Sequence, residues 1–430
     1  MNETHDPARK SWIESANIPG NDFPVQNLPF GVFKKPASGF HHVGVAIGDQ
    51  ILDITEARNE GFFSGIAGEA AEACADGTLN QFLSLGRGHW SALRKRLSEM
   101  LSDQKEKSTV SRCLVPMNDV EMQLPVAIGD YSDFYASIHH ATNVGSMFRP
   151  DNPLLPNYKY VPIGYHGRAS SIIPSGKMVK RPSGQTKSDD SPAPAFGPCK
   201  QLDYELEVGF FVGPGNEQGS PIGIDKAEQH IFGLCLVNDW SARDIQKWEY
   251  QPLGPFLSKS FATTISPWIV TLDALEPFRC PPFVRQSGDP DPLPYLKGED
   301  DAGAVDLILE VFISSAQMRE QKMDPMRISR GNFKELYWTI AQLLTHHASN
   351  GCNMRPGDLL ASGTVSGETR DSRGCLLERT WRGTEPIALP SAEIRKFLED
   401  GDEITIRGFC ENKNSVRIGF GECCGRISAT

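Results

Sequence analysis

Hydrophobic residues alternate with small or polar ones along several short stretches of this chain, a period typical of β-strands. The clearest stretch is residues 43–54, where Val43, Val45 and Ile47 alternate, Gly48-Asp49 can turn the chain, and residues 51–54 return as a second strand. Further strands are predicted at residues 206–211, 231–237, 306–313, 403–407 and 415–420. The pattern therefore predicts a fold that is mainly β.

Two stretches show helical spacing instead. Apolar residues recur at intervals of three and four between residues 90 and 101, which predicts one amphipathic helix. A second helix is predicted over residues 333–344, with Asn332 as its N-cap and Glu335 closing a capping box. His346-His347 lie at the end of this helix, where a favourable interaction with the helix dipole accounts for them. The expected fold is mainly β with some α.

The length of 430 residues favours two domains, and a charged segment marks where they meet. Residues 1–20 are polar and predict a flexible tail. Residues 102–108 are charged and lack apolar anchors, so we place the boundary between them and Leu124. We therefore expect an N-terminal domain over residues 1–120 and a larger C-terminal domain over residues 121–430.

Composition excludes two classes of partner. The 54 acidic residues outnumber the 43 basic ones, and no basic run with interleaved aromatics occurs, so nucleic acid is not an expected partner. No apolar run approaches the roughly 18 residues of a membrane helix, and the polar N-terminus lacks the apolar region of a secretory signal. We expect no membrane partner and a cytoplasmic protein, with its ten scattered cysteines as reduced thiols.

Two carboxylates stand out on a predicted strand. Glu205 and Glu207 are separated by one residue, so on a strand both point to the same side. Two negative charges this close repel unless a cation lies between them, and oxygen ligands favour Mg²⁺ or Ca²⁺ over zinc. The alternative is that the pair lies on the solvated face of an amphipathic strand. The apolar residues 209–212 favour the buried site, because they leave no polar face further along this strand.

Two further segments could complete such a site. Asp239 follows the apolar run 231–237, where a strand end commonly presents a functional side chain, although it could instead cap the helix that follows. The segment 133–140 adds Asp133 and two adjacent histidines. His139-His140 could be a structural pair, but the acidic and aromatic neighbours favour catalysis. A histidine beside a metal can prepare a water while the cation polarises a carbonyl.

Other side chains are suited to binding a substrate that carries carboxylates. The donors are Arg149, Arg243, Gln246 and Lys259, and hydroxyls could come from Tyr135, Tyr165 and Tyr250. No glycine-rich nucleotide loop and no Gly-x-Ser-x-Gly elbow occurs in the sequence. We therefore expect a small-molecule substrate and no organic cofactor.

Long motifs then point to a family. Those that carry the resemblance are residues 128–135, 140–145, 162–170, 238–246, 248–250, 252–257, 259–261 and 358–364. In this order, from about residue 22 to the C-terminus, the chain closely resembles the fumarylacetoacetase family. The resemblance implies a small SH3-like N-terminal barrel domain, a larger β-rich C-terminal domain of the fumarylacetoacetase type, and a homodimer. It also implies hydrolysis of 4-fumarylacetoacetate, a diketo acid, to fumarate and acetoacetate, the final step of tyrosine and phenylalanine catabolism.

The resemblance also assigns roles to individual residues. It implies Asp133, Glu205, Glu207 and Asp239 as ligands of Mg²⁺ or Ca²⁺, with Lys259 and Thr263 near a second metal contact. It implies His140 as the catalytic histidine and Glu378 as its carboxylate partner, with Arg243, Gln246 and Lys259 also catalytic. The substrate-binding positions it implies are Tyr135, Arg149, Tyr165, Arg243, Gln246, Tyr250 and Thr364.

Two other functions remain open at this point. Relatives on the same scaffold decarboxylate oxaloacetate, hydrolyse acylpyruvates, or isomerise and hydrate related keto acids, and fold alone does not separate these reactions. A panel of these substrates would separate the reactions. The chain could also be a non-catalytic β-rich binding protein, but the complete set of His140, Glu378, Lys259 and four carboxylates argues against it.

Overall fold

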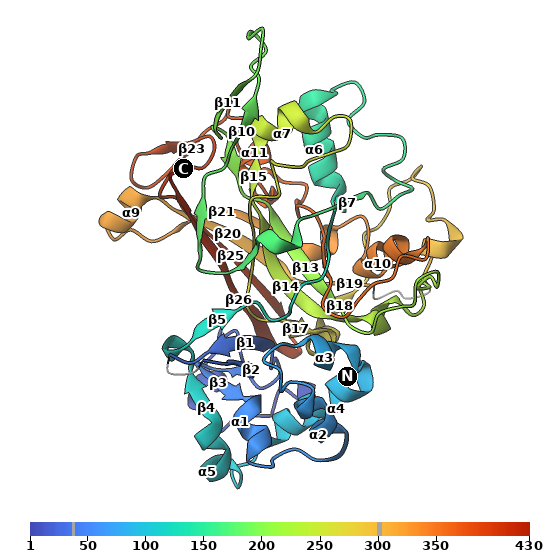
Figure 1. Ribbon diagram of the computed structural model, residues 1–430, viewed down its shortest axis with the longest axis vertical. Coiled ribbons are helices and arrows are strands. Elements are labelled where there is room, and N and C mark those ends of the chain that lie inside the picture. Colours follow the sequence, from blue (N-terminus) through green and yellow to red (C-terminus); the bar gives the residue numbers. More distant parts are fainter. Residues whose placement is uncertain (37–38, 299–302) are drawn as a thin grey trace.

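The computed structural model describes residues 1–36, 39–298 and 303–430, and Figure 1 shows a smaller N-terminal part below a larger β-rich part. The N-terminal sheet is antiparallel, in the order β4-β3-β2-β1-β5, as expected for the small β domain. Its strands are β1 (Phe30–Lys34), β2 (His41–Ile47), β3 (Gln50–Asp53), β4 (Leu114–Pro116) and β5 (Glu121–Gln123). The predicted hairpin at residues 43–54 is confirmed as β2 and β3. Strand β5 lies just beyond the expected division at residue 120.

Helices cover this sheet, and they are α1 (Ile54–Asn59), α2 (Gly65–Glu72), α3 (Asn80–Ser84), α4 (Arg87–Met100) and α5 (Lys107–Val110). The helix predicted between residues 90 and 101 is confirmed as α4, which buries Trp90, Leu93 and Leu97 on one face. The apolar spacing determines which face is buried, because residues three and four apart lie on the same side of a helix.

The expected flexible tail at residues 1–20 is wrong. This segment forms two 3₁₀ turns, η1 (Glu3–His5) and η2 (Glu14–Asn17), and packs against α4. The Nε1 of Trp12 donates a hydrogen bond to the carbonyl oxygen of Met100 at 2.9 Å. The guanidinium of Arg94 reaches the hydroxyl of Thr4 at 3.1 Å. A few specific contacts therefore order this segment, although most of its residues are polar.

The larger part contains two main sheets. The first has the order β7-β6-β22-β13-β14-β16-β8, with β17 paired to β14 beyond this path. Its strands are β6 (Tyr131–Phe134), β7 (Gly164–His166), β8 (Ile172–Pro174), β13 (Leu206–Val212), β14 (Ile231–Asp239), β16 (Thr263–Ile265), β17 (Val270–Thr271) and β22 (Leu359–Ala361). The second has the order β21-β20-β25-β26-β9, and its strands are β9 (Met178–Lys180), β20 (Ile308–Ser314), β21 (Met326–Asn332), β25 (Glu403–Asn412) and β26 (Ser415–Ser428). Every strand predicted between residues 206 and 420 is present in one of these two sheets.

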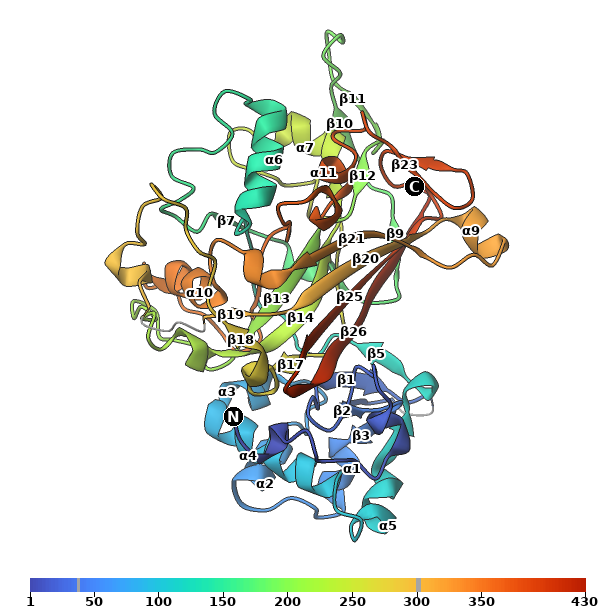
Figure 2. The same ribbon diagram turned by 180° about the vertical axis from the view of Figure 1, so that it is seen from behind.

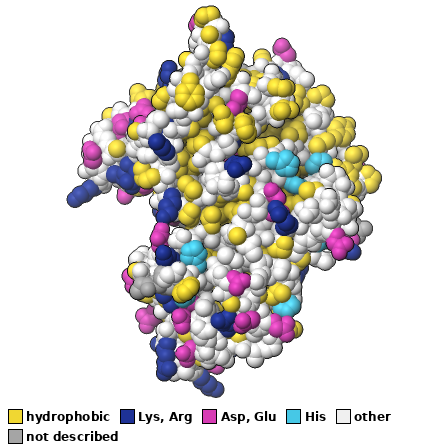
Figure 3. Space-filling model, in the orientation of Figure 1, with side chains coloured by type: hydrophobic (Ala, Val, Ile, Leu, Met, Phe, Trp, Pro, Cys, Tyr) yellow, Lys and Arg dark blue, Asp and Glu magenta, His cyan; other side chains and the backbone are white. Residues whose placement is uncertain are grey.

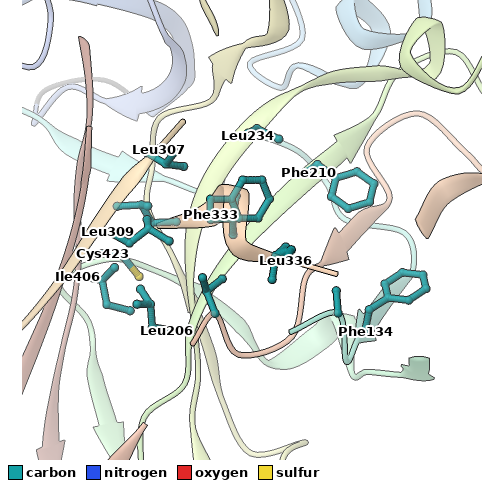
Figure 4. Close-up of a cluster of buried hydrophobic side chains, with 14 of the residues drawn as sticks. Phe134, Leu206, Phe210, Leu234, Leu307, Leu309, Phe333, Leu336, Ile406 and Cys423 are labelled. Atoms are coloured by element: carbon teal, nitrogen blue, oxygen red, sulfur yellow. The ribbon is translucent and has the colours of Figure 1, made fainter. Parts of the chain in front are cut away.

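The two sheets pack face to face around the main hydrophobic core (Figure 4). Leu206, Phe210 and Leu234 from the first sheet lie in one buried cluster with Leu309 and Ile406 from the second. The sheets approach closely at Gly408, where a Cβ atom would lie 2.8 Å from Cδ2 of Leu236. The long strands β25 and β26 run down toward the N-terminal part (Figure 2).

The N-terminal part covers another face of the first sheet. Phe232 of β14 packs its ring against Phe30, Phe82 and Trp90, with ring centroids 5.8, 5.5 and 5.1 Å away. Phe30 also pairs with Ile269 in an isolated antiparallel β-bridge, with backbone hydrogen bonds of 3.0 and 2.8 Å. The two parts therefore share a continuous apolar core.

The helix predicted from Asn332 begins later than expected. Asn332 caps only a 3₁₀ turn, η9 (Phe333–Glu335), and the α-helix α10 (Ile340–Ala348) has its own capping box of Thr339 and Gln342. Between them Leu336 is extended and the chain bends at Tyr337 and Trp338, where the N–H of Tyr337 donates to the carbonyl of Ala136 at 2.9 Å. This tertiary contact interrupts a continuous helical pattern.

His346 and His347 do lie in the last turn of α10, as predicted. Burial lowers the pKa of both imidazoles, so the helix dipole does not account for them as cations. His347 instead lies 2.7 Å from the hydroxyl of Ser132, measured from Nε2 to Oγ.

The remaining elements are short. The helices are α6 (Ile138–Phe148), α7 (Arg243–Glu249), α8 (Leu272–Leu275), α9 (Ala316–Glu320) and α11 (Leu376–Arg379). Four strand pairs are β10 (Ser183–Thr186) with β11 (Ala195–Pro198), β12 (Leu202–Asp203) with β15 (Ser241–Ala242), β18 (Arg279–Cys280) with β19 (Ala304–Val305), and β23 (Ile387–Ala388) with β24 (Ile394–Arg395). The other 3₁₀ turns are η3 (Ser111–Cys113), η4 (Met117–Asp119), η5 (Ala169–Ser171), η6 (Ala227–His230), η7 (Glu276–Phe278), η8 (Pro294–Leu296) and η10 (Arg370–Ser372). All ten cysteines are free thiols, as expected. Within the described ranges, every helix is too short or too polar to span a bilayer.

Candidate active site

Three strands of the first sheet bring four carboxylates together in the larger part. Asp133 lies on β6, Glu207 on β13 and Asp239 at the end of β14, while Glu205 immediately precedes β13. One oxygen from each lies within 4.8 Å of the others. Glu205 and Glu207 do point into one space, and the solvated alternative is excluded because they are only 5% and 0% exposed. Asp239 does not cap the next helix, since α7 has Ala242 at its N-cap.

Positive and polar groups surround this cluster. The Nζ of Lys259 donates to Oε2 of Glu205 at 2.5 Å and to Oδ2 of Asp239 at 2.9 Å. Asp239 also accepts hydrogen bonds from the hydroxyls of Thr263 at 2.6 Å and Tyr165 at 3.0 Å. Burial disfavours the charged lysine, but the two carboxylates outweigh it and raise the pKa of Lys259. Lys259 is therefore an ammonium, which donates to Glu205 and Asp239 and has no lone pair with which to coordinate a cation.

Glu207 is a buried carboxylate of this cluster whose two oxygens accept no hydrogen bond from the described residues. Burial, and then the charges of Asp133 and Asp239, raise the pKa of Glu207 well above its usual value. Four buried carboxylates with two unpaired oxygens fit a hard divalent cation, because Mg²⁺ and Ca²⁺ prefer oxygen ligands.

A histidine and a carboxylate form a second group. His140 lies on α6, where the N-cap hydroxyl of Ser137 accepts a hydrogen bond from its backbone N–H at 3.2 Å. Its Nδ1 lies 2.6 Å from Oε2 of Glu378, which is carried by α11 and is 0% exposed. Burial opposes ionisation of this carboxyl, yet His140 and its other donors lower the pKa of Glu378 to about 2. Glu378 therefore stays ionised and can orient the imidazole.

Three partners of Glu378 were not predicted from the sequence. Asn143 donates to its Oε1 at 2.8 Å, while Ser366 and Cys375 donate to Oε2 at 2.8 and 3.2 Å. Asn143 had a usable signal, because it follows His140 by three residues and so shares its helix face. Cys375, the N-cap residue of α11, precedes Glu378 by the same interval, whereas Ser366 lies in a loop and had no local signal.

Arg243 lies beside the carboxylate cluster. Its Nη1 pairs with Oε1 of Glu205 at 2.7 Å and donates to the side-chain oxygen of Gln246 at 3.1 Å. Its Nε donates to Asp203 at 2.9 Å, a buried carboxylate that the sequence analysis did not single out. The only local signal for Asp203 was its position two residues before Glu205.

The other predicted substrate positions lie at different distances from this centre. The rings of Tyr135 and His140 meet edge to face, with centroids 5.2 Å apart. Thr364 is buried, and its hydroxyl makes no hydrogen bond to any described residue. Arg149 ends α6, and Tyr250 follows α7 with 40% of its surface exposed. Among the described residues, no hydrogen bond or ion pair joins Arg149 or Tyr250 to the four carboxylates.

Comparison with known proteins gives matches over nearly the whole chain. Residues 26–125 match the family described as Fumarylacetoacetase N-terminal, and residues 131–428 match Fumarylacetoacetate (FAA) hydrolase C-terminal. The chain is 52% identical over 428 residues to fumarylacetoacetase of Caenorhabditis elegans, covering 97% of this chain and 99% of that protein. It is 49% identical over 414 residues to fumarylacetoacetase of Homo sapiens, covering 95% and 96%.

A solved structure shares the fold at much lower sequence similarity. Fumarylacetoacetate hydrolase from psychrophilic Exiguobacterium antarcticum aligns with a TM-score of 0.51 and 16% identity, covering 94% of this chain and 100% of that one. At this identity the likeness concerns the fold alone. The two family matches and the full-length relatives decide the assignment: the chain belongs to the fumarylacetoacetase family.

Proposed function

We propose that the chain hydrolyses 4-fumarylacetoacetate to fumarate and acetoacetate, the final step of tyrosine and phenylalanine catabolism. The observation that carries this proposal is the juxtaposition of the His140–Glu378 pair with the four-carboxylate cluster. Arg243 and Asp203 link the two groups, because Arg243 pairs with Glu205 at 2.7 Å and donates to Asp203 at 2.9 Å, while Asp203 accepts the N–H of Leu376 on the helix that carries Glu378. A base beside a site for a dication is suited to hydrolysing a carbonyl compound.

The substrate chemistry explains why such a site is needed. Breaking a carbon–carbon bond normally releases a carbanion, but in a 1,3-diketone the leaving carbon can depart as an enolate. The site must therefore stabilise negative oxygen. The ammonium of Lys259 and the side-chain amide of Gln246 are donors for that oxygen.

Four residues would hold the metal, namely Asp133, Glu205, Glu207 and Asp239. A bound Mg²⁺ or Ca²⁺ would polarise the substrate carbonyl and stabilise negative charge on its oxygen. Lys259 and Thr263 would act around the ligands, because each donates a hydrogen bond to a ligand carboxylate.

His140 is the proposed base. Glu378 holds Nδ1, which leaves Nε2 to accept a proton from water. The water oxygen bonds to the carbonyl carbon on the fumaryl side, and the tetrahedral oxyanion collapses with cleavage of the carbon–carbon bond. Fumarate is released, and the acetoacetate enolate takes a proton, which His140 can return.

The remaining residues would position the substrate. The predicted contacts are Tyr135, Arg149, Tyr165, Arg243, Gln246, Tyr250 and Thr364. Arginine side chains suit the two terminal carboxylates of the diketo acid. The unpaired hydroxyl of Thr364 and the edge of Tyr135 beside His140 suit the reacting end. Holding the substrate in the reacting orientation lowers the entropic part of the activation barrier.

The loss of fumarylacetoacetate ultraviolet absorbance tests the proposal directly. Purified protein is assayed with Mg²⁺, after chelation, and after metal is restored. Rapid loss that chelation abolishes and metal restores is expected. Absence of turnover, combined with activity on oxaloacetate or acylpyruvates in the same panel, would replace this function with another reaction of the scaffold.

We also propose that the protein is a cytoplasmic homodimer whose catalytic part is residues 121–430, with residues 1–120 as a separate N-terminal domain. Hydrophobic side chains gather over the upper half of the larger part in Figure 3, and Phe196, Leu253 and Phe256 are 76%, 95% and 70% exposed. Exposed apolar surface of this kind favours association.

The cytoplasmic location is proposed because free thiols suit a reducing compartment. Light scattering and cell fractionation would test the two statements.

A further inference from the structure

Asp203 holds an unusual position between the two halves of the candidate site. It lies on β12, is 0% exposed, and its carboxylate accepts four hydrogen bonds. Oδ1 accepts from the backbone N–H groups of Tyr204 at 2.9 Å and Leu376 at 2.7 Å. Oδ2 accepts from the N–H of Leu377 and from Nε of Arg243, both at 2.9 Å.

The contacts with the backbone N–H groups of Leu376 and Leu377 fix the start of α11. This helix has only four residues, and its N-cap residue Cys375 makes no side-chain capping hydrogen bond. The N–H groups of the first residues of a helix have no partner within the helix. Asp203 supplies that partner from another part of the chain, and its negative charge is favourable at this end. Glu378 is the third residue of the same helix, so its position depends on this anchor.

The other contact fixes the side of the site that holds the carboxylates. The guanidinium of Arg243 donates Nε to Asp203, while its Nη1 pairs with Glu205 at 2.7 Å. Glu205 in turn accepts from Lys259 at 2.5 Å. The carboxylate of Asp203 therefore sets the distance between α11, which carries Glu378, and Arg243, which contacts the carboxylate cluster.

We propose that Asp203 is a positioning residue for catalysis, because it aligns the Glu378–His140 pair with the carboxylate cluster. The alignment must be accurate, since His140 and Glu378 are joined by a single contact of 2.6 Å. An error of about 1 Å in such a constellation can lower turnover roughly 100-fold. The inference rests on the proposed function for its kinetic test, but its spectroscopic test does not.

The variant Asp203→Asn keeps the size of the side chain and removes its double acceptor role. In either orientation of the amide, an NH₂ group faces two donors, which are Leu376 and Tyr204 on one side or Leu377 and Arg243 on the other. Either orientation removes one anchor of α11, because the N–H of Leu376 or of Leu377 then faces an NH₂ group. A purely structural carboxylate offers a matched control: Asp402 is also 0% exposed, accepts from Arg395 at 2.8 and 3.0 Å, and accepts the N–H of Glu399.

Kinetics form the first test. Asp203→Asn is expected to lower kcat roughly 10- to 100-fold with little change in KM, whereas Asp402→Asn leaves kcat within about twofold. The double variant Asp203→Asn, Glu378→Gln should fall no more than about threefold below Glu378→Gln alone, because both changes act on one contact. An unchanged kcat in Asp203→Asn would overturn the proposal. So would a double variant that loses the full product of the two factors.

A proton spectrum gives the second test and needs no turnover. The Nδ1–H proton of His140, hydrogen-bonded to Glu378, is expected as a downfield resonance that His140→Ala removes. It should persist in Asp402→Asn and be lost or shifted upfield in Asp203→Asn. An unchanged resonance in Asp203→Asn would overturn the proposal even if wild-type protein failed to hydrolyse fumarylacetoacetate, a failure that would count against the proposed function alone. If Asp203→Asn did not fold, Asp203→Glu would be measured in the same way. This variant keeps the charge, but its side chain is longer by one methylene group and therefore shifts α11.

Discussion

Nδ1 of His140 lies 2.6 Å from Oε2 of Glu378, although 238 positions of the sequence separate the two residues. The contact is buried, and the second carboxylate oxygen of Glu378 is held by Asn143 at 2.8 Å. Both oxygens are therefore engaged, which fixes the plane of the carboxylate. An imidazole held in this way presents Nε2 as the free nitrogen, the orientation that a general base requires.

Replacing His140 with alanine should lower kcat by roughly 10²- to 10⁴-fold, because the base that activates water is lost. Metal content and the circular dichroism spectrum should remain those of the wild type, since none of the four carboxylates is changed. His346→Ala is a matched control, because that histidine contacts Tyr295 rather than the site. Turnover close to wild type in His140→Ala would remove this residue as the base.

Replacing Asp133 with alanine should weaken Ca²⁺ or Mg²⁺ binding by roughly tenfold or more, because one charged ligand of four is lost. Isothermal titration and metal analysis of the purified variant measure this directly. Asp130→Ala serves as the control, since Asp130 is a nearby surface carboxylate paired with Arg355. An unchanged metal content in Asp133→Ala would contradict its assignment as a ligand.

The sequence was informative wherever a local period decides the outcome. Alternation placed Glu205 and Glu207 on one side of a strand, and the end of an apolar run placed Asp239 at a strand terminus. Both follow from geometry within a few residues. Asp133 joins them only because β6 pairs in parallel with β22, where Asp133 lies opposite Ala361. That pairing spans more than half of the chain and leaves no local pattern.

The incorrect predictions have the opposite cause. A continuous apolar pattern from residue 333 predicted one helix, but the chain bends at Tyr337, whose N–H donates to the carbonyl of Ala136. The polar first 20 residues are ordered by a few long-range contacts, such as Trp12 with Met100. Glu378 lies on a helix of four residues, too short for any periodicity, so only the family resemblance indicated it. Tertiary contacts outweighed local preference in each case.

The ionisation of Glu378 predicts how its contribution to stability changes with pH. Its pKa is lowered from 4.5 to about 2, so the ionised carboxylate stabilises the fold above pH 4.5, and this contribution is lost as the pH falls through about 2. The difference in Tm between wild type and Glu378→Gln should therefore be largest near neutral pH and shrink below pH 4.5. Glu385→Gln, a surface change, should show little difference at any pH. A gap between wild type and Glu378→Gln that widens on acidification would contradict the stabilising role of the ionised carboxylate.

Glu207 links metal binding to stability. Its two oxygens lack hydrogen-bond partners among the described residues, and its burial among three other carboxylates is unfavourable without a cation. Chelation should lower the Tm of the wild type, and Ca²⁺ or Mg²⁺ should restore it. At a free metal concentration of about 100 times Kd the expected stabilisation is about 2.7 kcal/mol.

The variant Glu207→Gln separates the two effects on Tm. Without metal it should melt at a higher temperature than the chelated wild type, because one of four buried like charges is gone. With Ca²⁺ it should gain much less than the wild type, because a charged ligand is missing. Glu422→Gln, on the surface beside Arg407, should respond to chelation as the wild type does. If chelated Glu207→Gln melted below the chelated wild type, the carboxylates could not be repelling one another, and the cluster would owe its stability to Lys259 and Arg243 instead of to a cation.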